Sequence, residues 1–435
     1  MSPGNLILSL VGQIEAACIP CVYLRNHENL PDDVGNDVDL LIQKGETIKA
    51  LAIISAEAPK YGWKVLRTVQ FSPLSVFLAA DNGEVLMHID LFERIEWHCV
   101  EYAESQRIID RRQWNGRVHI PNPADELYLN ISTRLIYQGK VREKHRLQAK
   151  SLINQGMQEA IRESFAHHMG HKHGIGMADA VIKGEWQQLE ASAATLRRTA
   201  SMRYATLSPM AALMSLYRYS RRSIGRIVFP PGPFVVFEGA DGVGKSTVIE
   251  GILPLLKELT GRSDTLLFHW KPNKASLRIA GQSAGAASDP RGKHPRPVPL
   301  SLLFLAYHWI GYWVGYLRHV LPARAKNRSV IGDRYSYEFF LDPSRLRIKL
   351  PAWINRLAAY SVPQPDMVIA LVADPEIIRA RKPELGTDEI DLYQTRLVSM
   401  AAKTSRCLIV RAHGNADEVR RVAQNRILER LRSKS

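Results

Sequence analysis

A glycine-rich stretch in the second half of the chain carries the clearest chemical signal. Residues 239–246 read GADGVGKS and match the pattern GxxxxGK[ST] at every fixed position. Glycines let successive backbone N–H groups face phosphate oxygens, Lys245 reaches the outer phosphates, and Ser246 is a ligand for Mg²⁺. The stretch therefore predicts a site for a nucleoside triphosphate with Mg²⁺, built from Gly239, Asp241, Gly242, Val243, Gly244, Lys245, Ser246 and Thr247.

The elements on either side of this stretch are those that a phosphate loop needs. The apolar run FVVFE at 234–238 predicts a buried strand before it, and a helical pattern begins at Thr247 after it. The N-terminus of a helix carries a partial positive charge, which favours a bound anion. We therefore expect strand, loop and helix in that order.

A second carboxylate follows the next apolar strand. The segment 329–335 reads SVIGDRY, which places Asp333 at the carboxyl end of a strand, where a fold of this kind needs a ligand for Mg²⁺. Arg334 beside it can neutralise or orient a transferring phosphate. An Asp-Arg surface turn is the other interpretation.

Basic residues follow a further strand at 365–371. Arg379 and Arg381 lie just beyond it, where they could close over a triphosphate and supply charge when the donor is bound. A solvated helix end would have the same composition.

Taken in order, FEGADGVGKST, DRY, PDMVIALVADPEIIRAR and EIDLYQTRLVSMA resemble the motifs of the thymidylate kinase family of nucleoside monophosphate kinases, over residues 234–435. The resemblance implies an α/β P-loop NTPase fold with a doubly wound parallel sheet, and transfer of the γ-phosphate of ATP to an acceptor with Mg²⁺. Carried over by position, the catalytic residues are Lys245, Asp333, Arg334, Arg379 and Arg381, and Ser246 and Asp333 serve the metal.

The acceptor side departs from this family. His269-Trp270-Lys271-Pro272 stands where the family has Arg-Glu-Pro, and His308 stands where it has an Arg near the thymine pocket. The resemblance thus implies an acceptor side of Asp241, Lys271, His308 and Arg334. Because of these departures the acceptor stays open between dTMP and another nucleotide, a sugar or a lipid-linked glycan. The HWKP segment resembles kinase-like proteins of bacterial surface-polysaccharide loci, so a role in surface-polysaccharide or nucleotide-sugar metabolism is expected.

The front of the chain carries a separate acidic pattern. Asp37 and Asp39 lie two residues apart on a predicted strand and share one face, and Asp90 follows on a later strand. Three carboxylates on neighbouring strands can hold Mg²⁺ for nucleotidyl transfer. Residues 15–130 resemble the minimal nucleotidyltransferase fold, although Arg25-Asn26 replaces the Gly-Ser pair of that family. A substrate-binding or docking module is the alternative.

The length of the chain predicts more than one domain. At 435 residues it exceeds what one ordinary hydrophobic core holds. We expect an α+β nucleotidyltransferase-like domain at 1–125, a helical connector at 126–228, and the kinase-like domain at 234–435 after the linker VFPPGP. The apolar segment 300–321 is expected to be a core helix rather than a membrane span.

The composition bounds the partners. The chain has 58 Lys and Arg against 43 Asp and Glu, a net charge of +15, which suits polyanions such as nucleotides or an anionic membrane. No motif makes a case for nucleic acid. The basic amphipathic segment 213–226 fits either peripheral membrane contact or an interdomain helix, and a homodimer is also open. Four cysteines suit a reducing cytoplasm.

Three functions follow from these patterns. The first is an ATP-dependent kinase with an unidentified acceptor. The second is a nucleotidyltransferase in the front domain with a regulatory P-loop domain. The third is a nucleotide-gated switch that binds a partner without transfer.

Overall fold

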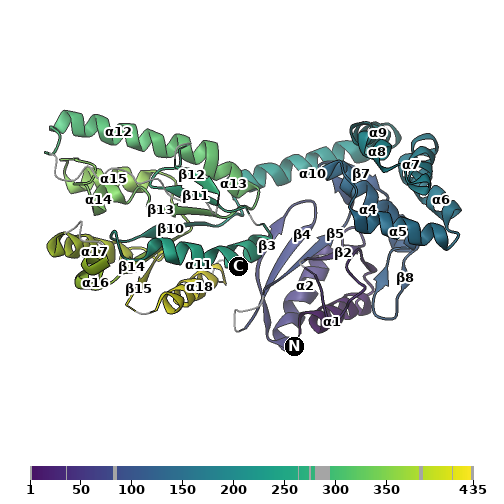
Figure 1. Ribbon diagram of the computed structural model, residues 1–435, viewed down its shortest axis with the longest axis horizontal. Helices are drawn as coiled ribbons and strands as arrows, with labels where there is room; N and C mark the ends of the chain where they lie inside the picture. The colour runs from purple at the N-terminus through teal and green to yellow at the C-terminus, as the bar shows by residue number, and fades with distance from the viewer. Residues whose placement is uncertain are drawn as a thin grey trace. The chain divides into compact units, whose positions relative to one another are not determined.

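The computed structural model describes residues 2–35, 37–81, 86–262, 264–273, 276–279, 294–381, 386–413 and 415–432. Contacts within the chain divide it into two units, residues 1–222 and residues 223–434. Figure 1 shows both units.

The first unit is built on a five-stranded sheet in the order β1-β2-β5-β4-β3, in which β2 and β5 are parallel and the other neighbours antiparallel. Its strands are β1 (Cys21–Tyr23), β2 (Val38–Ile42), β3 (Trp63–Gln70), β4 (Leu74–Ala80) and β5 (Leu86–Phe92). Because side chains alternate along a strand, Val38 and Leu40 pack into one core with α1 (Pro3–Ala16) and α2 (Thr47–Glu57), whereas Leu41 joins a second core. Both faces of the sheet are therefore covered.

Helices build the rest of the first unit. They are α3 (Ser105–Asp110), α4 (Pro123–Gln138), α5 (Glu143–Asn154), α6 (Gln158–Met169), α7 (His171–Lys183), α8 (Trp186–Ala191), α9 (Ala193–Leu207) and the start of α10 (Pro209–Val228), with two short hairpins, β6 (Ile95–Trp97) with β7 (Val100–Ala103) and β8 (Gln113–Trp114) with β9 (His119–Ile120). Residues of α4 to α9 share one hydrophobic core with Val22 and Leu41 of the sheet. The segment suggested as a connector thus packs against the front strands.

The second unit contains a six-stranded sheet in the order β12-β11-β13-β10-β14-β15, in which only β12 is antiparallel to its neighbour. The strands are β10 (Phe234–Glu238), β11 (Leu266–His269), β12 (Leu277–Ile279), β13 (Val330–Asp333), β14 (Met367–Val372) and β15 (Cys407–Arg411). Every residue of β10 is buried, as expected for a strand covered on both faces. The mixed α/β class with a parallel sheet is confirmed.

The helices of the second unit follow the strands in alternation. They are α11 (Lys245–Thr260), α12 (Val298–Gly315), α13 (Leu321–Ala325), α14 (Glu338–Leu341), α15 (Ala352–Ser361), α16 (Pro375–Arg381), α17 (Thr387–Ala401) and α18 (Ala416–Arg432), with a π-helical turn at Tyr316–Val320. The helices α11 and α18 pack against each other (Figure 1). Because parallel strands end at one edge, His269, Asp333 and Phe237 lie side by side in the β11-β13-β10 register.

The apolar segment 300–321 differs from its expectation. It forms most of a continuous helical stretch, Val298–Ala325, that is long and apolar enough to cross a membrane, yet only 28% of its most apolar window is buried. The expectation of a core helix is wrong, because only one stripe of α12, with Leu305, His308 and Tyr312, packs into the unit. The remaining faces are exposed and apolar.

A buried histidine should make the stability of the first unit depend on pH. His168 is 8% exposed, stacks on Tyr128 at 4.5 Å between ring centres, and its Nδ1 accepts a hydrogen bond from the Glu104 N–H. Burial, with smaller effects of nearby cations, lowers the pKa of His168 to about 3. The unfolded chain, with a pKa of about 6.5, therefore binds more protons as the pH falls below that value.

We predict that the free energy of unfolding of the first unit falls by about 2 kcal/mol between pH 7 and pH 5 because of His168. Urea unfolding followed at both pH values measures this loss. His168→Gln should make the loss about 2 kcal/mol smaller than in the wild type, whereas His173→Gln, at an exposed position on α7, should leave it unchanged. An equal loss in both variants would contradict the assignment to His168.

A buried ion pair ties the second unit together. Arg334 is 1% exposed, and its Nη1 donates to Glu338 Oε2 at 2.9 Å. Tyr393 donates to the other Glu338 oxygen at 2.8 Å. Removing one member of a buried pair leaves the other charge without compensation.

We predict that Glu338→Gln lowers the free energy of unfolding of the second unit by about 3 kcal/mol. The matched control is Glu429→Gln, which removes the exposed Arg426–Glu429 pair of 3.1 Å and should change stability by less than about 0.5 kcal/mol. Chemical denaturation of both variants is the measurement. Similar losses in the two variants would show that burial does not strengthen the Arg334 pair.

Candidate functional site

The glycine-rich stretch forms a turn between β10 and α11. The strand ends at Glu238 and the helix begins at Lys245. Gly242 and Gly244 have φ values of 91° and 101°, in the left-handed region that other residues rarely adopt. This geometry places the loop at the N-terminus of a 16-residue helix, which is where an anion is favoured.

Lys245 is folded back onto this loop. Its Nζ donates to the carbonyl oxygens of Gly239 at 2.8 Å and Ala240 at 3.1 Å. Burial, followed by the charge of Arg334, lowers the pKa of Lys245 to about 8. Ser246 and Thr247 follow in the first turn and are exposed. The ammonium is thus held in the loop, where phosphate oxygens could replace the carbonyls as its partners.

Asp333 lies at the carboxyl end of β13 and pairs in register with His269 of β11. Its Oδ2 lies 2.9 Å from His269 Nδ1, and its Oδ1 is buried with no hydrogen-bond partner in the described part of the chain. Burial would raise the pKa of Asp333, but the His269 hydrogen bond and the charge of Lys245 outweigh burial and lower it. An ionised carboxylate with a free buried oxygen fits a Mg²⁺ ligand.

Asp241 lies close to three basic side chains around the phosphate loop. Its two oxygens lie 2.6 Å from Arg334 Nη2 and 3.3 Å from Arg345 Nη1, and Lys245 Nζ is 3.9 Å away. Burial alone would raise the pKa of Asp241, but Arg334, Lys245 and Arg345 hold it well below its usual range. The guanidinium of Arg334 therefore lies between Asp241 and Glu338 rather than in solvent.

The backbone is strained where two neighbouring strands end. Trp270 follows β11 with a φ of 66°, and Arg334 follows β13 with a φ of 69°. For side chains other than glycine this conformation costs about 1–2 kcal/mol per residue. Hydrogen bonds from Trp270 N–H to the Asp333 carbonyl, 2.8 Å, and from Arg334 N–H to the Phe237 carbonyl, 2.9 Å, hold both residues. Strain of this kind concentrates at functional sites.

Lys271 and His308, both expected on the acceptor side, lie together. Lys271 Nζ is 3.4 Å from His308 Nδ1 and 4.8 Å from the centre of the Tyr307 ring. Burial, with Lys271 and Arg296 nearby, lowers the pKa of His308 to about 4, so its ring is neutral at pH 7. His308 Nε2 and Trp270 Nε1 are buried without hydrogen-bond partners in the described residues. This cluster thus contains one cation and two buried polar nitrogens without hydrogen-bond partners among the described residues.

The two arginines expected over the triphosphate differ in their placement. Both lie in the last turn of α16 and are exposed. A Cβ atom placed on Gly244 would lie 4.0 Å from Arg381 Nη1, so Arg381 reaches the phosphate loop. Arg379 is carried by the same helix but has no described contact with the loop.

The acidic residues of the first unit also converge. Asp39 and Asp90 are register partners on the parallel strands β2 and β5, and Asp37 directly precedes β2. Arg25 pairs with both Asp37, at 2.9 Å, and Asp39. Burial raises the pKa of Asp39 to about 6 although Arg25 opposes this shift. The geometry fits a cation, but the guanidinium of Arg25 already supplies one.

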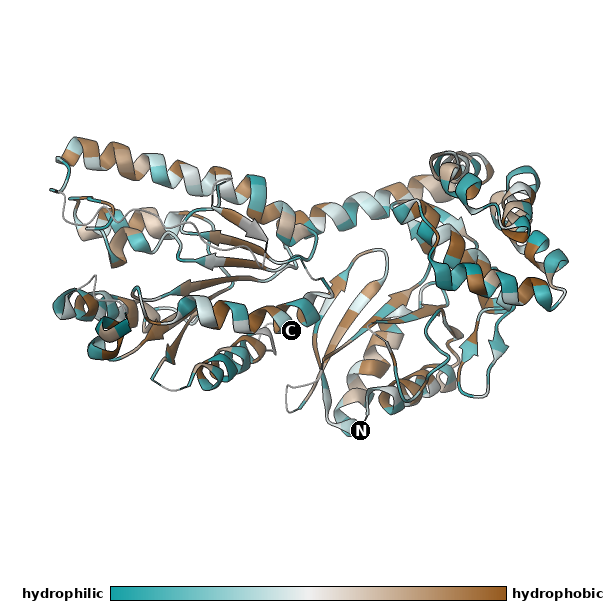
Figure 2. Ribbon diagram, in the orientation of Figure 1, coloured by the Kyte–Doolittle hydropathy of each residue, from teal (hydrophilic) through white to brown (hydrophobic). Residues whose placement is uncertain are grey.

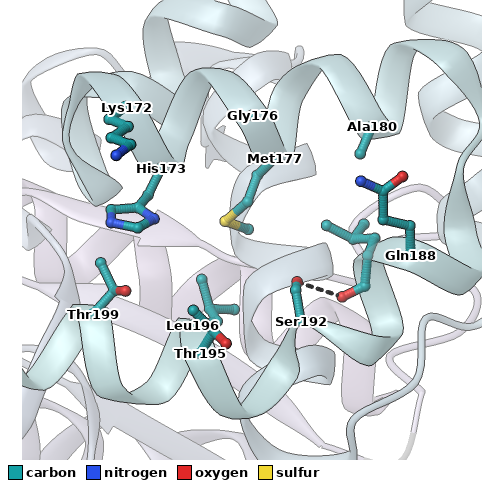
Figure 3. Close-up of a pocket in the computed structure, with 11 residues that line it drawn as sticks. Lys172, His173, Gly176, Met177, Ala180, Gln188, Ser192, Thr195, Leu196 and Thr199 are labelled. Atoms are coloured by element: carbon teal, nitrogen blue, oxygen red, sulfur yellow. Dashed lines mark hydrogen bonds between the residues drawn. The ribbon is translucent and has the colours of Figure 1, made fainter.

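Another hollow lies in the helical part of the first unit. The helices α7, α8 and α9 enclose a pocket of about 270 Å³ lined by Lys172, His173, Met177 and Thr199 among others (Figure 3). None of the predicted site residues lines it.

Several site residues were not predicted from the sequence. Arg345 reaches Asp241 across 104 positions of the chain, and no motif marks it. Glu338 lies four residues after Arg334, a helical spacing that could have indicated the pair. His269 was seen as a departure from a family pattern, but its hydrogen bond to Asp333 depends on strand register.

Comparisons by sequence and by structure both find thymidylate kinases. No family model matches the sequence. A probable thymidylate kinase of Methanocorpusculum labreanum is 30% identical over 148 residues, which cover 33% of this chain and 66% of that protein. The chain thus spans just under two thirds of that relative.

Among solved structures, thymidylate kinase from Ehrlichia chaffeensis matches 46% of this chain and 100% of its own, with 14% identity and a TM-score of 0.32. A similarity of that size carries no weight by itself. The sequence similarity, together with the phosphate loop described above, identifies a kinase-like P-loop region in this protein.

Proposed function

We propose that the second unit is an ATP- and Mg²⁺-dependent phosphotransferase of the nucleoside monophosphate kinase type. The observation that carries this proposal is the convergence of Lys245, in the phosphate loop, with Asp333 at the end of the neighbouring strand β13. Lys245 and the helix N-terminus would bind the donor phosphates, while Ser246 and the free oxygen of Asp333 would hold the metal. The metal would neutralise charge on the phosphates.

Transfer in such a site depends on placement and charge more than on covalent chemistry. Arg381, which reaches Gly244, would stabilise negative charge on the transferring group, with Arg379 on the same helix. Arg334 would act through Asp241, because its guanidinium is already held by two carboxylates. Asp241 would in turn hold the phosphate loop in place on the side where the acceptor is expected to bind.

The acceptor proposed is not dTMP. The acceptor side carries the neutral His308 and the single ammonium of Lys271, which lacks the two-pronged geometry of an arginine. The candidate acceptors are another nucleotide, a sugar and a lipid-linked glycan. The enzyme would be cytoplasmic and would act in surface-polysaccharide or nucleotide-sugar metabolism.

We predict that Lys245→Ala lowers the rate of γ-phosphate transfer at least about 100-fold, since it removes a charge that stabilises the transferring phosphate. The measurement uses γ-labelled ATP, Mg²⁺ and a panel of nucleoside monophosphates, sugars and lipid-linked glycans. The control is Lys257→Ala in the last turn of the same helix, which should transfer at the wild-type rate. Nucleotide binding without transfer to any acceptor would instead favour a nucleotide-gated switch.

A second candidate function rests on the first unit. We propose nucleotidyl transfer there as the alternative, because Asp39 and Asp90 lie side by side on neighbouring parallel strands and Asp37 directly precedes β2. Bound Mg²⁺ would activate the attack on the α-phosphate. The Arg25 side chain has to leave the carboxylates before a metal can take its place.

We predict that Arg25→Ala binds Mn²⁺, used in place of Mg²⁺, about tenfold more tightly in the first unit than the wild type does, because an internal cation no longer competes. Titration calorimetry on the full chain measures the affinity, and Asp333→Ala in both proteins removes the proposed metal ligand of the second unit. Asp37→Ala with Asp39→Ala should abolish this binding. Transfer of α-labelled nucleotide that these two changes abolish would make the first unit the active one.

A further inference from the structure

The helix α12 presents a row of apolar side chains to solvent. Six side chains of this row are each between 53% and 67% exposed: Leu300, Leu303, Tyr307, Ile310, Val314 and Leu317. The last of them lies in the π-helical turn that follows α12. Figure 2 shows hydrophobic residues along this helix, interrupted by more hydrophilic ones. Their spacing of three and four residues places them on one side of the helix. A contiguous row of exposed apolar side chains is typical of an interaction site.

The neighbouring helix α15 extends this surface. Trp353, Leu357 and Tyr360 are 66%, 64% and 43% exposed and share one side of α15. The Trp309 indole N–H donates to Ser361 Oγ at 2.8 Å, which fastens α15 beside α12. We call the exposed apolar residues of the two helices the apolar face.

The charged side chains of the two segments that carry the apolar face all have one sign. Its basic residues are Arg296 and Arg318 near the ends of α12, and Arg347, Lys349 and Arg356 in and before α15. Residues 294–332 and 343–361 contain no Asp or Glu. Hydrogen bonds between side chains and backbone keep the two segments adjacent. Arg296 Nη1 donates to the Leu346 carbonyl at 2.6 Å, and the Lys349 N–H donates to Ser301 Oγ at 3.1 Å.

We propose that the apolar face binds to the surface of an anionic lipid bilayer. Apolar side chains gain by leaving water for the acyl boundary, and a basic rim is attracted to anionic headgroups. The helix would lie on the membrane rather than cross it, because Leu305, His308 and Tyr312 on its other side are buried in the protein. Tyr307, Trp353 and Tyr360 are of the types enriched at the membrane–water boundary.

A second copy of the chain is a poorer occupant for this face. Self-association would bring two basic rims together with no acidic residue from either segment to compensate. An anionic bilayer complements that charge instead. The binding should therefore weaken as salt screens it.

The test is flotation of the full chain with vesicles of phosphatidylglycerol and phosphatidylcholine, compared with vesicles of phosphatidylcholine alone. The wild type should float with the anionic vesicles and remain below with the neutral ones at low salt. Leu303→Glu with Ile310→Glu should reduce binding at least about tenfold. Arg318→Gln with Arg356→Gln should reduce it about fivefold for each charge removed.

The matched control is Leu392→Glu on α17 of the same unit, where the side chain is 51% exposed outside the apolar face. It should float as the wild type does, and urea unfolding of every variant shows that each one folds. Failure of the wild type to bind anionic vesicles overturns the proposal. A wild-type dimer in light scattering that Leu303→Glu with Ile310→Glu converts to monomer, with vesicle binding unchanged, would assign the face to a second copy and overturn it as well.

Discussion

The ion pairs of Arg334 are the interaction on which the second unit depends. Its guanidinium is buried and contacts Asp241 in the phosphate loop and Glu338 in α14, while Tyr393 from α17 donates to Glu338. One side chain at the end of β13 thus joins the loop to two helices. A buried charge needs such partners, since the cost of its desolvation is otherwise several kcal/mol. The strained backbone of Arg334 lies at the same point, and its N–H donates to the Phe237 carbonyl at 2.9 Å.

The acidic residues of the two units differ in the partners that they already have. In the second unit one oxygen of Asp333 has no hydrogen-bond partner among the described residues, so a metal could bind there without displacing a protein group. In the first unit Arg25 already contacts Asp37 and Asp39, so a metal would have to compete with a guanidinium. This difference in electrostatic cost is the physical reason to place phosphoryl transfer in the second unit first.

The sequence predicted local features well and tertiary contacts poorly. The strand, glycine loop and helix at 234–260 could be expected because each has a local signal of periodicity or glycine spacing. The pairing of His269 with Asp333 and the approach of Arg345 to Asp241 depend on strand register and on segments far apart in the chain. The strand β3 was not predicted, because its sequence WKVLRTVQ has no regular alternation of apolar and polar residues.

The helix α12 shows why apolar composition alone does not predict burial. Its buried stripe includes His308 and Tyr312 beside Leu305, while its other leucines and its isoleucine are exposed, so apolar type and burial do not coincide on this helix. A helix with its side chains is about 10 Å across, so the Lys271–His308 pair lies within roughly that distance of the apolar face. If that face binds a bilayer, the proposed acceptor side lies close to the membrane surface. Of the acceptors proposed for the kinase, a lipid-linked glycan is then the one whose location matches that of the site.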